Sequence, residues 1–234
     1  PIVSRIAKKL HLVDAPALRK VHRVPVPRVG GLVFVLTTLF FIIPCFLLNS
    51  YIGESFRESQ IQFIVLLAAA CFIFIVGFID DLRPISGYIK LLCLILASGA
   101  ICTSGATLHS FSIGRWEVET GMLAWPLTII WIVVITVGMN FIDGLDGLAA
   151  GIAVFVIGII FIMALSSGQI AMALLMLVLL GSVTGFLFFN FYPAKIFMGD
   201  GGSMFLGFMI GASSIVYQSK TSTLIGLGIT FLVM

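Results

Sequence analysis

The sequence predicts an all-α fold, a polytopic bundle of transmembrane helices, and three observations support this prediction. Of the 234 residues, 60% are hydrophobic and only 10% are charged, whereas a soluble domain carries roughly 25% charged residues. The apolar residues gather in runs close to the roughly 20 residues that a helix needs to cross a bilayer. The alternation of apolar and polar residues that is typical of transmembrane β-barrels is not found.

The apolar runs, taken in chain order, predict seven full spans and a partial one, about eight in all. They cover residues 31–49, 61–79, 88–105, 123–140, 149–166, 170–190, 203–218 and 222–234. The last run stops at Met234 and is too short to cross a bilayer, and the sequence starts at Pro1 instead of a methionine. We therefore expect the sequence to be a piece of a longer protein, cut at both ends.

Each span is bounded by a polar or glycine-rich stretch. The first span follows a basic segment, the second ends in an acidic pair, the third starts near a lysine, and the fourth ends at an asparagine. The tight hairpin 166–169 joins the fifth and sixth spans, and the seventh follows a glycine-rich turn. No internal repeat or linker interrupts the series, so we predict one integral domain, 1–234. It consists of a basic juxtamembrane segment, 1–30, and the transmembrane bundle, 31–234.

The distribution of lysine and arginine predicts which loops face the cytoplasm. Seven of the thirteen basic residues lie before the first span, and cytoplasmic segments of membrane proteins carry an excess of these residues. Alternation then places loops 80–88, 140–148 and 190–202 in the cytoplasm, so that all six aspartates lie inside and all four glutamates outside. Because no basic stripe continues beyond the N-terminal segment, we predict no nucleic-acid binding.

Asp80 and Asp81 follow the second span directly. Adjacent carboxylates repel each other unless a cation or a proton neutralises one of them, and a negative charge at a helix C-terminus opposes the helix dipole. The pair therefore favours a metal or proton-transfer site over a solvated helix end. Lys90, nine residues after Asp81, is either a point charge for a diphosphate or an interfacial lysine whose ammonium group reaches the headgroups.

Asn140, Asp143 and Asp146 are spaced three residues apart, which puts them on one face if the helix continues. Three oxygen-bearing side chains on one face suit a magnesium ion or the hydroxyl groups of a ribose. The alternative is a polar seam between packed helices.

Asp200 lies in the glycine-rich stretch 198–203, just before the seventh span. Glycines at a helix N-terminus expose backbone N–H groups that favour anions, and an aspartate fits beside an anion if a divalent cation bridges them. An ordinary turn uses the same residues. The basic, proline-broken segment 20–31 is equally compatible with binding anionic headgroups and with a lid for a phosphorylated lipid.

Four stretches, 19–32, 77–81, 140–151 and 190–203, together resemble the polyprenyl-phosphate N-acetylhexosamine-1-phosphate transferases. The N-terminal stretch is more similar to the bacterial WecA/TagO branch of this family than to MraY. The resemblance implies a role for each candidate residue. The implied roles are catalysis for Asp80, Asp81 and Lys90; substrate binding for Asp143, Asp146, Asn190, Phe197 and Lys90; and binding of Mg2+, or alternatively Mn2+, for Asp200 and Asn140.

The resemblance also implies the reaction. A sugar 1-phosphate, most simply GlcNAc-1-phosphate, passes from a UDP-N-acetylhexosamine to undecaprenyl or another polyprenyl phosphate, and UMP is released. Such an enzyme starts a cell-envelope polysaccharide, as in lipopolysaccharide or teichoic acid synthesis, at the cytoplasmic face of the bacterial inner membrane, and members of the family often form homodimers. A direct attack by the lipid phosphate and a covalent aspartyl-phosphate route both stay open.

The sequence departs from the family pattern in three places. Pro84 stands where a third acid often follows the acidic pair, Val137 stands where many members have a second asparagine, and the family's histidine-rich cytoplasmic motif is not found. Two other classes of function also explain buried carboxylates: a cation- or proton-coupled transporter and a membrane scaffold. Transporters place their coupling residues near the midplane, whereas the acids here lie at span ends, so we favour the transferase.

Overall fold

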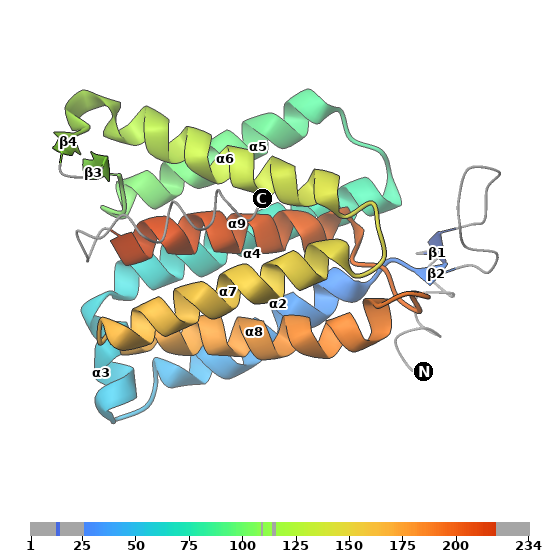
Figure 1. Ribbon diagram of the computed structural model, residues 1–234, viewed down its shortest axis with the longest axis horizontal. Coiled ribbons are helices and arrows are strands. Elements are labelled where there is room, and N and C mark those ends of the chain that lie inside the picture. The colour runs from blue at the N-terminus through green and yellow to red at the C-terminus, as the bar shows by residue number, and fades with distance from the viewer. Residues whose placement is uncertain (1–12, 15–25, 109, 114–115, 219–234) are drawn as a thin grey trace.

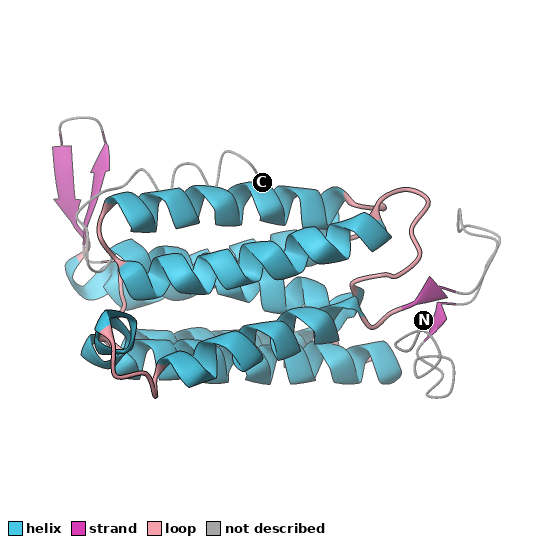
Figure 2. Cartoon of the chain, turned by 90° about the horizontal axis from the view of Figure 1, so that it is seen from below, coloured by secondary structure: helices cyan, strands magenta, loops and turns pink. Residues whose placement is uncertain are grey.

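The fold is a bundle of helices that run alongside one another (Figure 1, Figure 2). The computed structural model describes residues 13–14, 26–108, 110–113 and 116–218. The helices are α2 (Gly30–Cys45), α3 (Tyr51–Glu58), α4 (Gln60–Leu82), α5 (Gly87–Thr103), α6 (Ala124–Ile142), α7 (Leu148–Ser166), α8 (Ile170–Asn190) and α9 (Gly199–Gln218). A short 3-10 helix, η1 (Gly121–Leu123), leads into α6.

The helices confirm the predicted all-α membrane bundle. Each of the seven full spans corresponds to one long helix, with ends that differ from the prediction by a few residues. Of the described helices, α4, α6 with η1, α7 and α8 are long and apolar enough to cross a membrane, and α2 and α5 are shorter apolar helices. The predicted partial span, 222–234, lies outside the described residues.

Short elements that the sequence did not predict lie at the two ends of the bundle. The loop expected at 50–60 contains helix α3, and the loop 106–122 contains an antiparallel hairpin of β3 (Ser110–Ile113) and β4 (Trp116–Glu119). A second small pair, β1 (Val13–Asp14) and β2 (Val26–Pro27), lies at the opposite end (Figure 1). Most of the predicted basic segment, 1–30, lies outside the described residues.

Helix α9 is the centre of the bundle. Every residue from Gly201 to Tyr217 is buried. Helix α9 contacts α2, α4, α6 and α7, and Figure 1 shows it between α6 and α7. Small residues allow this close packing, because helices inside a membrane associate through van der Waals contact and not through the hydrophobic effect. A Cβ atom on Gly207, for example, would lie only 2.7 Å from the Cα atom of Thr136 on α6.

The outer surface of the bundle is apolar. Large hydrophobic side chains point outward from several helices, among them Phe40 on α2, Leu96 on α5 and Phe155 on α7, which are 73%, 61% and 58% exposed. A soluble protein rarely exposes large contiguous apolar patches, whereas lipid tails solvate such a surface. The protein is therefore an integral membrane protein, with its loops at the two ends of the helices.

Candidate active site

Five aspartates gather at the end of the bundle that carries β1 and β2. Asp80 and Asp81 occupy the last turn of α4, Asp143 and Asp146 lie in the loop between α6 and α7, and Asp200 lies in the first turn of α9. The other predicted site residues lie at the same end: Lys90 in the first turn of α5, Asn140 in the last turn of α6, Asn190 at the end of α8, and Phe197 just before α9. The structure thus places every predicted site residue at the same end of the bundle.

Lys90 links two of the carboxylates. Its ammonium group lies 2.6 Å from Asp80 Oδ2 and 3.3 Å from Asp200 Oδ2. The other oxygen of Asp80 accepts a hydrogen bond of 2.6 Å from the backbone N–H of Ile85, in the loop between α4 and α5. The Asp200 side chain is 36% exposed, against 11% for Asp80, so Asp200 is the more accessible carboxylate of this group.

Asp81 is bound differently from its neighbour Asp80. Its Oδ1 accepts a hydrogen bond from the backbone N–H of Asp200 and its Oδ2 accepts one from Gly201, each at 3.0 Å. Both oxygens therefore contact the first turn of α9. The side chain reaches the acidic cluster from α4, but both of its oxygens already have backbone partners.

Asp143 is the most strongly perturbed carboxyl group in the loops of this end. Burial, followed by the negative charges of Asp200 and Asp81, raises its pKa to about 7, and the nearby Arg28 opposes the shift. Asp143 therefore holds a proton for part of the time near neutral pH. A cation bound among these carboxylates would favour the ionised form of Asp143.

Asp146 and Asn190 join two loops. Asp146 Oδ2 accepts a hydrogen bond of 3.0 Å from the backbone N–H of Ala194, and Asn190 Oδ1 accepts one of 3.1 Å from Gly147. The Asn190 amide group also donates to the carbonyl of Ile196 at 3.0 Å. These bonds shape the α6–α7 and α8–α9 loops around the site, and the predicted contact of Asp146 and Asn190 with substrate stays a prediction.

A magnesium ion fits the chemistry of this end. Asn140 donates a hydrogen bond from its amide nitrogen Nδ2 to Ser203 Oγ at 2.9 Å. Its amide oxygen is an acceptor, which can serve as a metal ligand. Among the residues that the structure describes, no set of three or more His, Cys, Asp and Glu side chains forms a closed metal cage. Mg2+ does not need one, since it usually keeps several waters and binds one or two carboxylates together with substrate phosphates. Asp200, with Asn140, can supply such oxygen ligands.

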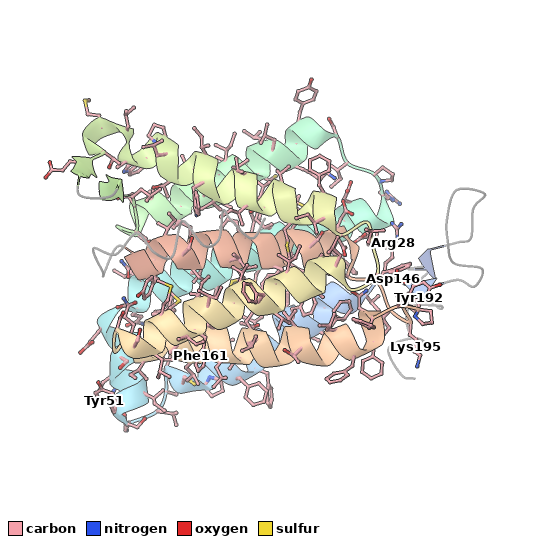
Figure 3. The ribbon with its side chains drawn as sticks, viewed as in Figure 1. Arg28, Tyr51, Asp146, Phe161, Tyr192 and Lys195 are labelled. Atoms are coloured by element: carbon pink, nitrogen blue, oxygen red, sulfur yellow. The ribbon has the colours of Figure 1, made fainter. Side chains whose placement is uncertain are left out.

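Arg28 lies near the acidic cluster, although the sequence did not single it out as a candidate site residue. The chain around it is fixed to the loop before α9, because Phe197 N–H donates to Pro27 O at 2.8 Å and Gly30 N–H donates to Phe197 O at 3.0 Å. Arg28 lies close enough to Asp81 and Asp143 for an attractive electrostatic interaction with each. Figure 3 shows it at the same end as Asp146. The sequence signal for Arg28 is its position directly before Val29-Gly30-Gly31, inside the stretch 19–32 that carries part of the family resemblance.

Comparison with known proteins gives consistent results. The model of the family described as "Glycosyl transferase family 4" matches residues 63–218. The chain is 40% identical over 236 residues to the "Probable undecaprenyl-phosphate N-acetylglucosaminyl 1-phosphate transferase" of Bacillus subtilis (strain 168), covering 100% of this chain and 63% of the relative. It is 35% identical over 225 residues to the "Decaprenyl-phosphate N-acetylglucosaminephosphotransferase" of Mycobacterium leprae, covering 91% of this chain and 56% of the relative.

A third relative has a different enzyme name. The chain is 30% identical over 217 residues to the "Phospho-N-acetylmuramoyl-pentapeptide-transferase" of Clostridium beijerinckii, covering 87% of this chain and 64% of the relative. The chain thus spans less than two thirds of the length of these curated relatives.

Proposed function

The chain belongs to glycosyl transferase family 4, and we propose that it transfers a sugar 1-phosphate from a UDP-N-acetylhexosamine to a polyprenyl phosphate. The names of the Bacillus and Mycobacterium relatives favour N-acetylglucosamine as the sugar and undecaprenyl or decaprenyl phosphate as the acceptor. The product is a lipid diphosphate that carries the sugar, the first intermediate of a cell-envelope polysaccharide. UMP is the other product.

The observation that carries the proposal is the cluster of Asp80, Lys90 and Asp200. It lies at one end of an apolar bundle, where the helices would leave the membrane. An oxygen of the lipid phosphate forms a bond to the sugar-bearing phosphorus of the donor, and the bond from that phosphorus to the oxygen of UMP breaks. Both substrates are anionic, so catalysis depends mainly on positioning and on neutralising charge. Lys90 is partly exposed, so its ammonium group can turn from the carboxylates to phosphate oxygens.

Asp80 is the best-placed group to keep the lipid phosphate deprotonated. Its Oδ2 lies beside Lys90 at the centre of the cluster. A phosphate monoester loses its second proton at a pKa of about 6, but nearby carboxylates favour the protonated form. Asp80 can accept the proton when the acceptor binds, and the ammonium group of Lys90 beside it favours the ionised phosphate.

Asp200 and Asn140 would hold a magnesium ion, or manganese in its place. When bound, such an ion neutralises charge on the diphosphate during transfer. The fit rests on oxygen donors from two helices that meet at this end, with Asp200 partly exposed. The pKa of the nearby Asp143, which burial and then the neighbouring carboxylates raise to about 7, supports a cation here, because a bound cation would favour the ionised form.

We place the site at the cytoplasmic face of a bacterial inner membrane. The lysine and arginine residues that precede α2 support this orientation, and UDP-sugars are cytosolic. A coupled transporter is not favoured, because every described aspartate and glutamate lies at an end of the bundle and none lies near its middle.

An incubation of the protein in lipid nanodiscs with UDP-[14C]GlcNAc, undecaprenyl phosphate and magnesium tests this function. We expect butanol-extractable label and one UMP for each labelled lipid. Asp200→Ala should abolish transfer while the protein stays folded. Normal turnover by Asp200→Ala, or labelled sugar taken up into vesicles without lipid product, would contradict the assignment.

A further inference from the structure

We propose that the two adjacent aspartates at the end of α4 have different tasks. Asp80 faces the reacting groups, whereas Asp81 is a positioning residue that holds the N-terminus of α9 and thereby orients Asp200. This inference rests on the proposed function and refines it. It differs from the expectation that both carboxylates share the work of a base.

Asp81 caps α9 from another helix. The first four N–H groups of a helix lack partners within it, and an acidic side chain that accepts their hydrogen bonds stabilises the helix, as does its charge beside the helix dipole. Met198, directly before α9, has no side-chain group that can accept in this way. Asp81 instead supplies both acceptors, for Asp200 and Gly201, from 119 and 120 residues away in the sequence.

The backbones of α4 and α9 touch where Asp81 acts. A Cβ atom on Gly77, one turn before Asp81, would lie 2.6 Å from the carbonyl oxygen of Asp200, and a Cβ atom on Gly201 would lie 3.0 Å from the N atom of Phe78. A Cβ atom on Gly199 would lie 2.7 Å from Asp81 Oδ2. The glycines therefore allow an approach that no larger residue permits, and the Asp81 carboxylate occupies space that a side chain at position 199 would fill.

Asp80 faces a different direction. Neighbouring residues on a helix point about 100° apart, so Asp80 reaches Lys90 on α5 while Asp81 reaches α9. Asp80 Oδ2 shares the ammonium group of Lys90 with Asp200 Oδ2, and a substrate phosphate can replace either carboxylate in that contact. Each Asp81 oxygen already accepts a backbone N–H of α9, so a proton or a cation on Asp81 would weaken these two hydrogen bonds.

The consequence is that Asp200 depends on Asp81 for its place. The N–H of Asp200 itself is one of the two groups that Asp81 holds, and its carboxylate contacts Lys90 at the same time. Loss of the cap frees the first turn of α9, so the carboxylate of Asp200 moves relative to Lys90 and Asp80. We expect weaker cation and donor binding, with the chemical step less affected once the site is saturated.

Four variants test this division. Asp81→Asn keeps one acceptor oxygen but presents an NH2 group to the second backbone N–H. Gly77→Ala pushes on the carbonyl of Asp200 and removes no carboxylate. Asp80→Asn removes the candidate base, and Gly158→Ala on α7 is the matched control, because a Cβ atom there meets nothing within 4 Å.

The measurements are the melting temperature in nanodiscs, its rise with added magnesium, and steady-state kinetics. We expect Asp81→Asn and Gly77→Ala to lower the melting temperature by at least about 3 °C and to raise the half-saturating magnesium concentration at least about fivefold. At saturating magnesium both should retain more kcat than Asp80→Asn, which we expect to lose about 100-fold or more in kcat with a smaller fall in melting temperature than Asp81→Asn. Gly158→Ala should match the wild type in every measurement.

The inference and the proposed function fail in different ways. If the wild-type protein transfers no label, the proposed function is contradicted. The melting temperatures of the variants would still report whether Asp81 stabilises the N-terminus of α9. If the wild type is active and Asp81→Asn abolishes kcat at every magnesium concentration with an unchanged melting temperature, Asp81 is a catalytic group and the inference is wrong. An unchanged melting temperature and magnesium requirement in Gly77→Ala would overturn it as well.

Discussion

Arg28 and Lys90 approach the acidic cluster from different parts of the chain. Lys90 contacts Asp80 and Asp200 from α5, while Arg28 interacts with Asp81 and Asp143 from the segment paired with Phe197. Five carboxylates would otherwise repel the diphosphate of the proposed donor. A guanidinium group is well suited to oppose this repulsion, because its planar fork matches two phosphate oxygens.

We expect Arg28→Gln to raise KM for UDP-GlcNAc about 10-fold and to change KM for the lipid phosphate less. A tenfold rise corresponds to about 1.4 kcal/mol, near the lower end of the free energy of one charge-assisted hydrogen bond. Arg28→Lys should recover part of it, because the charge returns without the fork. Steady-state kinetics with each substrate varied in turn measure both constants. Arg83→Gln, which removes an exposed charge at the same end, is the control, and equal KM values in Arg28→Gln and Arg83→Gln would refute the role.

Asp143 should make stability depend on pH. Its pKa rises to about 7 in the folded protein because of burial and of the charges of Asp200 and Asp81, so the folded state holds a proton that the unfolded state has released. The contribution of this proton to the free energy of unfolding is therefore fully present below pH 4 and is lost as the pH rises through 7. The shift corresponds to at most about 4 kcal/mol.

Asp143→Asn removes this titration. We expect the variant to melt at a higher temperature than the wild type at pH 8 and at the same temperature at pH 4, measured without magnesium in nanodiscs. Added magnesium should reduce the difference in melting temperature between the variant and the wild type at pH 8, because a cation stabilises the ionised Asp143 of the wild type. Equal melting at pH 8 without magnesium would show that Asp143 is not held in an unfavourable charge state.

At the scale of elements, α9 shows where sequence reasoning stopped. The sequence predicted a span at 203–218, but α9 starts at Gly199, because Asp81 of a distant helix holds its first N–H groups. Helix α3 was missed since Glu54 and Arg57 interrupt its apolar residues within a predicted loop. The seven long runs needed no such tertiary information, since length and hydropathy alone set them.

The contact between α2 and α9 should tolerate no added side chain. A Cβ atom on Gly31 would lie 2.4 Å from the Cα atom of Gly202, and a backbone cannot yield as a flexible side chain can. We expect Gly31→Ala to lower the melting temperature by several degrees, or about 1–3 kcal/mol. Gly99→Ala on α5, where a Cβ atom meets nothing within 4 Å, is the control. Equal melting temperatures would mean that the two helices are not packed as closely as described.

At the scale of the whole molecule, the two ends of the bundle differ in their acids. Aspartates of α4, α9 and the α6–α7 loop lie at one end, and Glu54 and Glu58 of α3 lie at the other. The sequence could predict this separation, because alternation of spans fixes the side of each loop. The sequence could not predict which of these residues contact one another, because the partners of Lys90 and Asp81 depend on how the helices pack.

Labelling in intact cells can test the orientation. In a background without the four native cysteines, we expect a membrane-impermeant maleimide to label Glu54→Cys and to spare Lys195→Cys until the membrane is permeabilised. Both positions are exposed, so access depends on the side of the membrane. Labelling of Lys195→Cys in intact cells would place the acidic end outside and contradict a cytosolic donor.

The most direct test of the account follows the β-phosphate of the donor. With UDP-GlcNAc labelled at the β-phosphorus and undecaprenyl phosphate as acceptor, we expect the label to enter the lipid product and unlabelled UMP to be released. The Asp200→Ala variant should form neither the labelled lipid nor UMP. If the label stays in UDP while sugar reaches the lipid, the bond between sugar and phosphate has broken instead, and the proposed transfer of a sugar 1-phosphate is wrong.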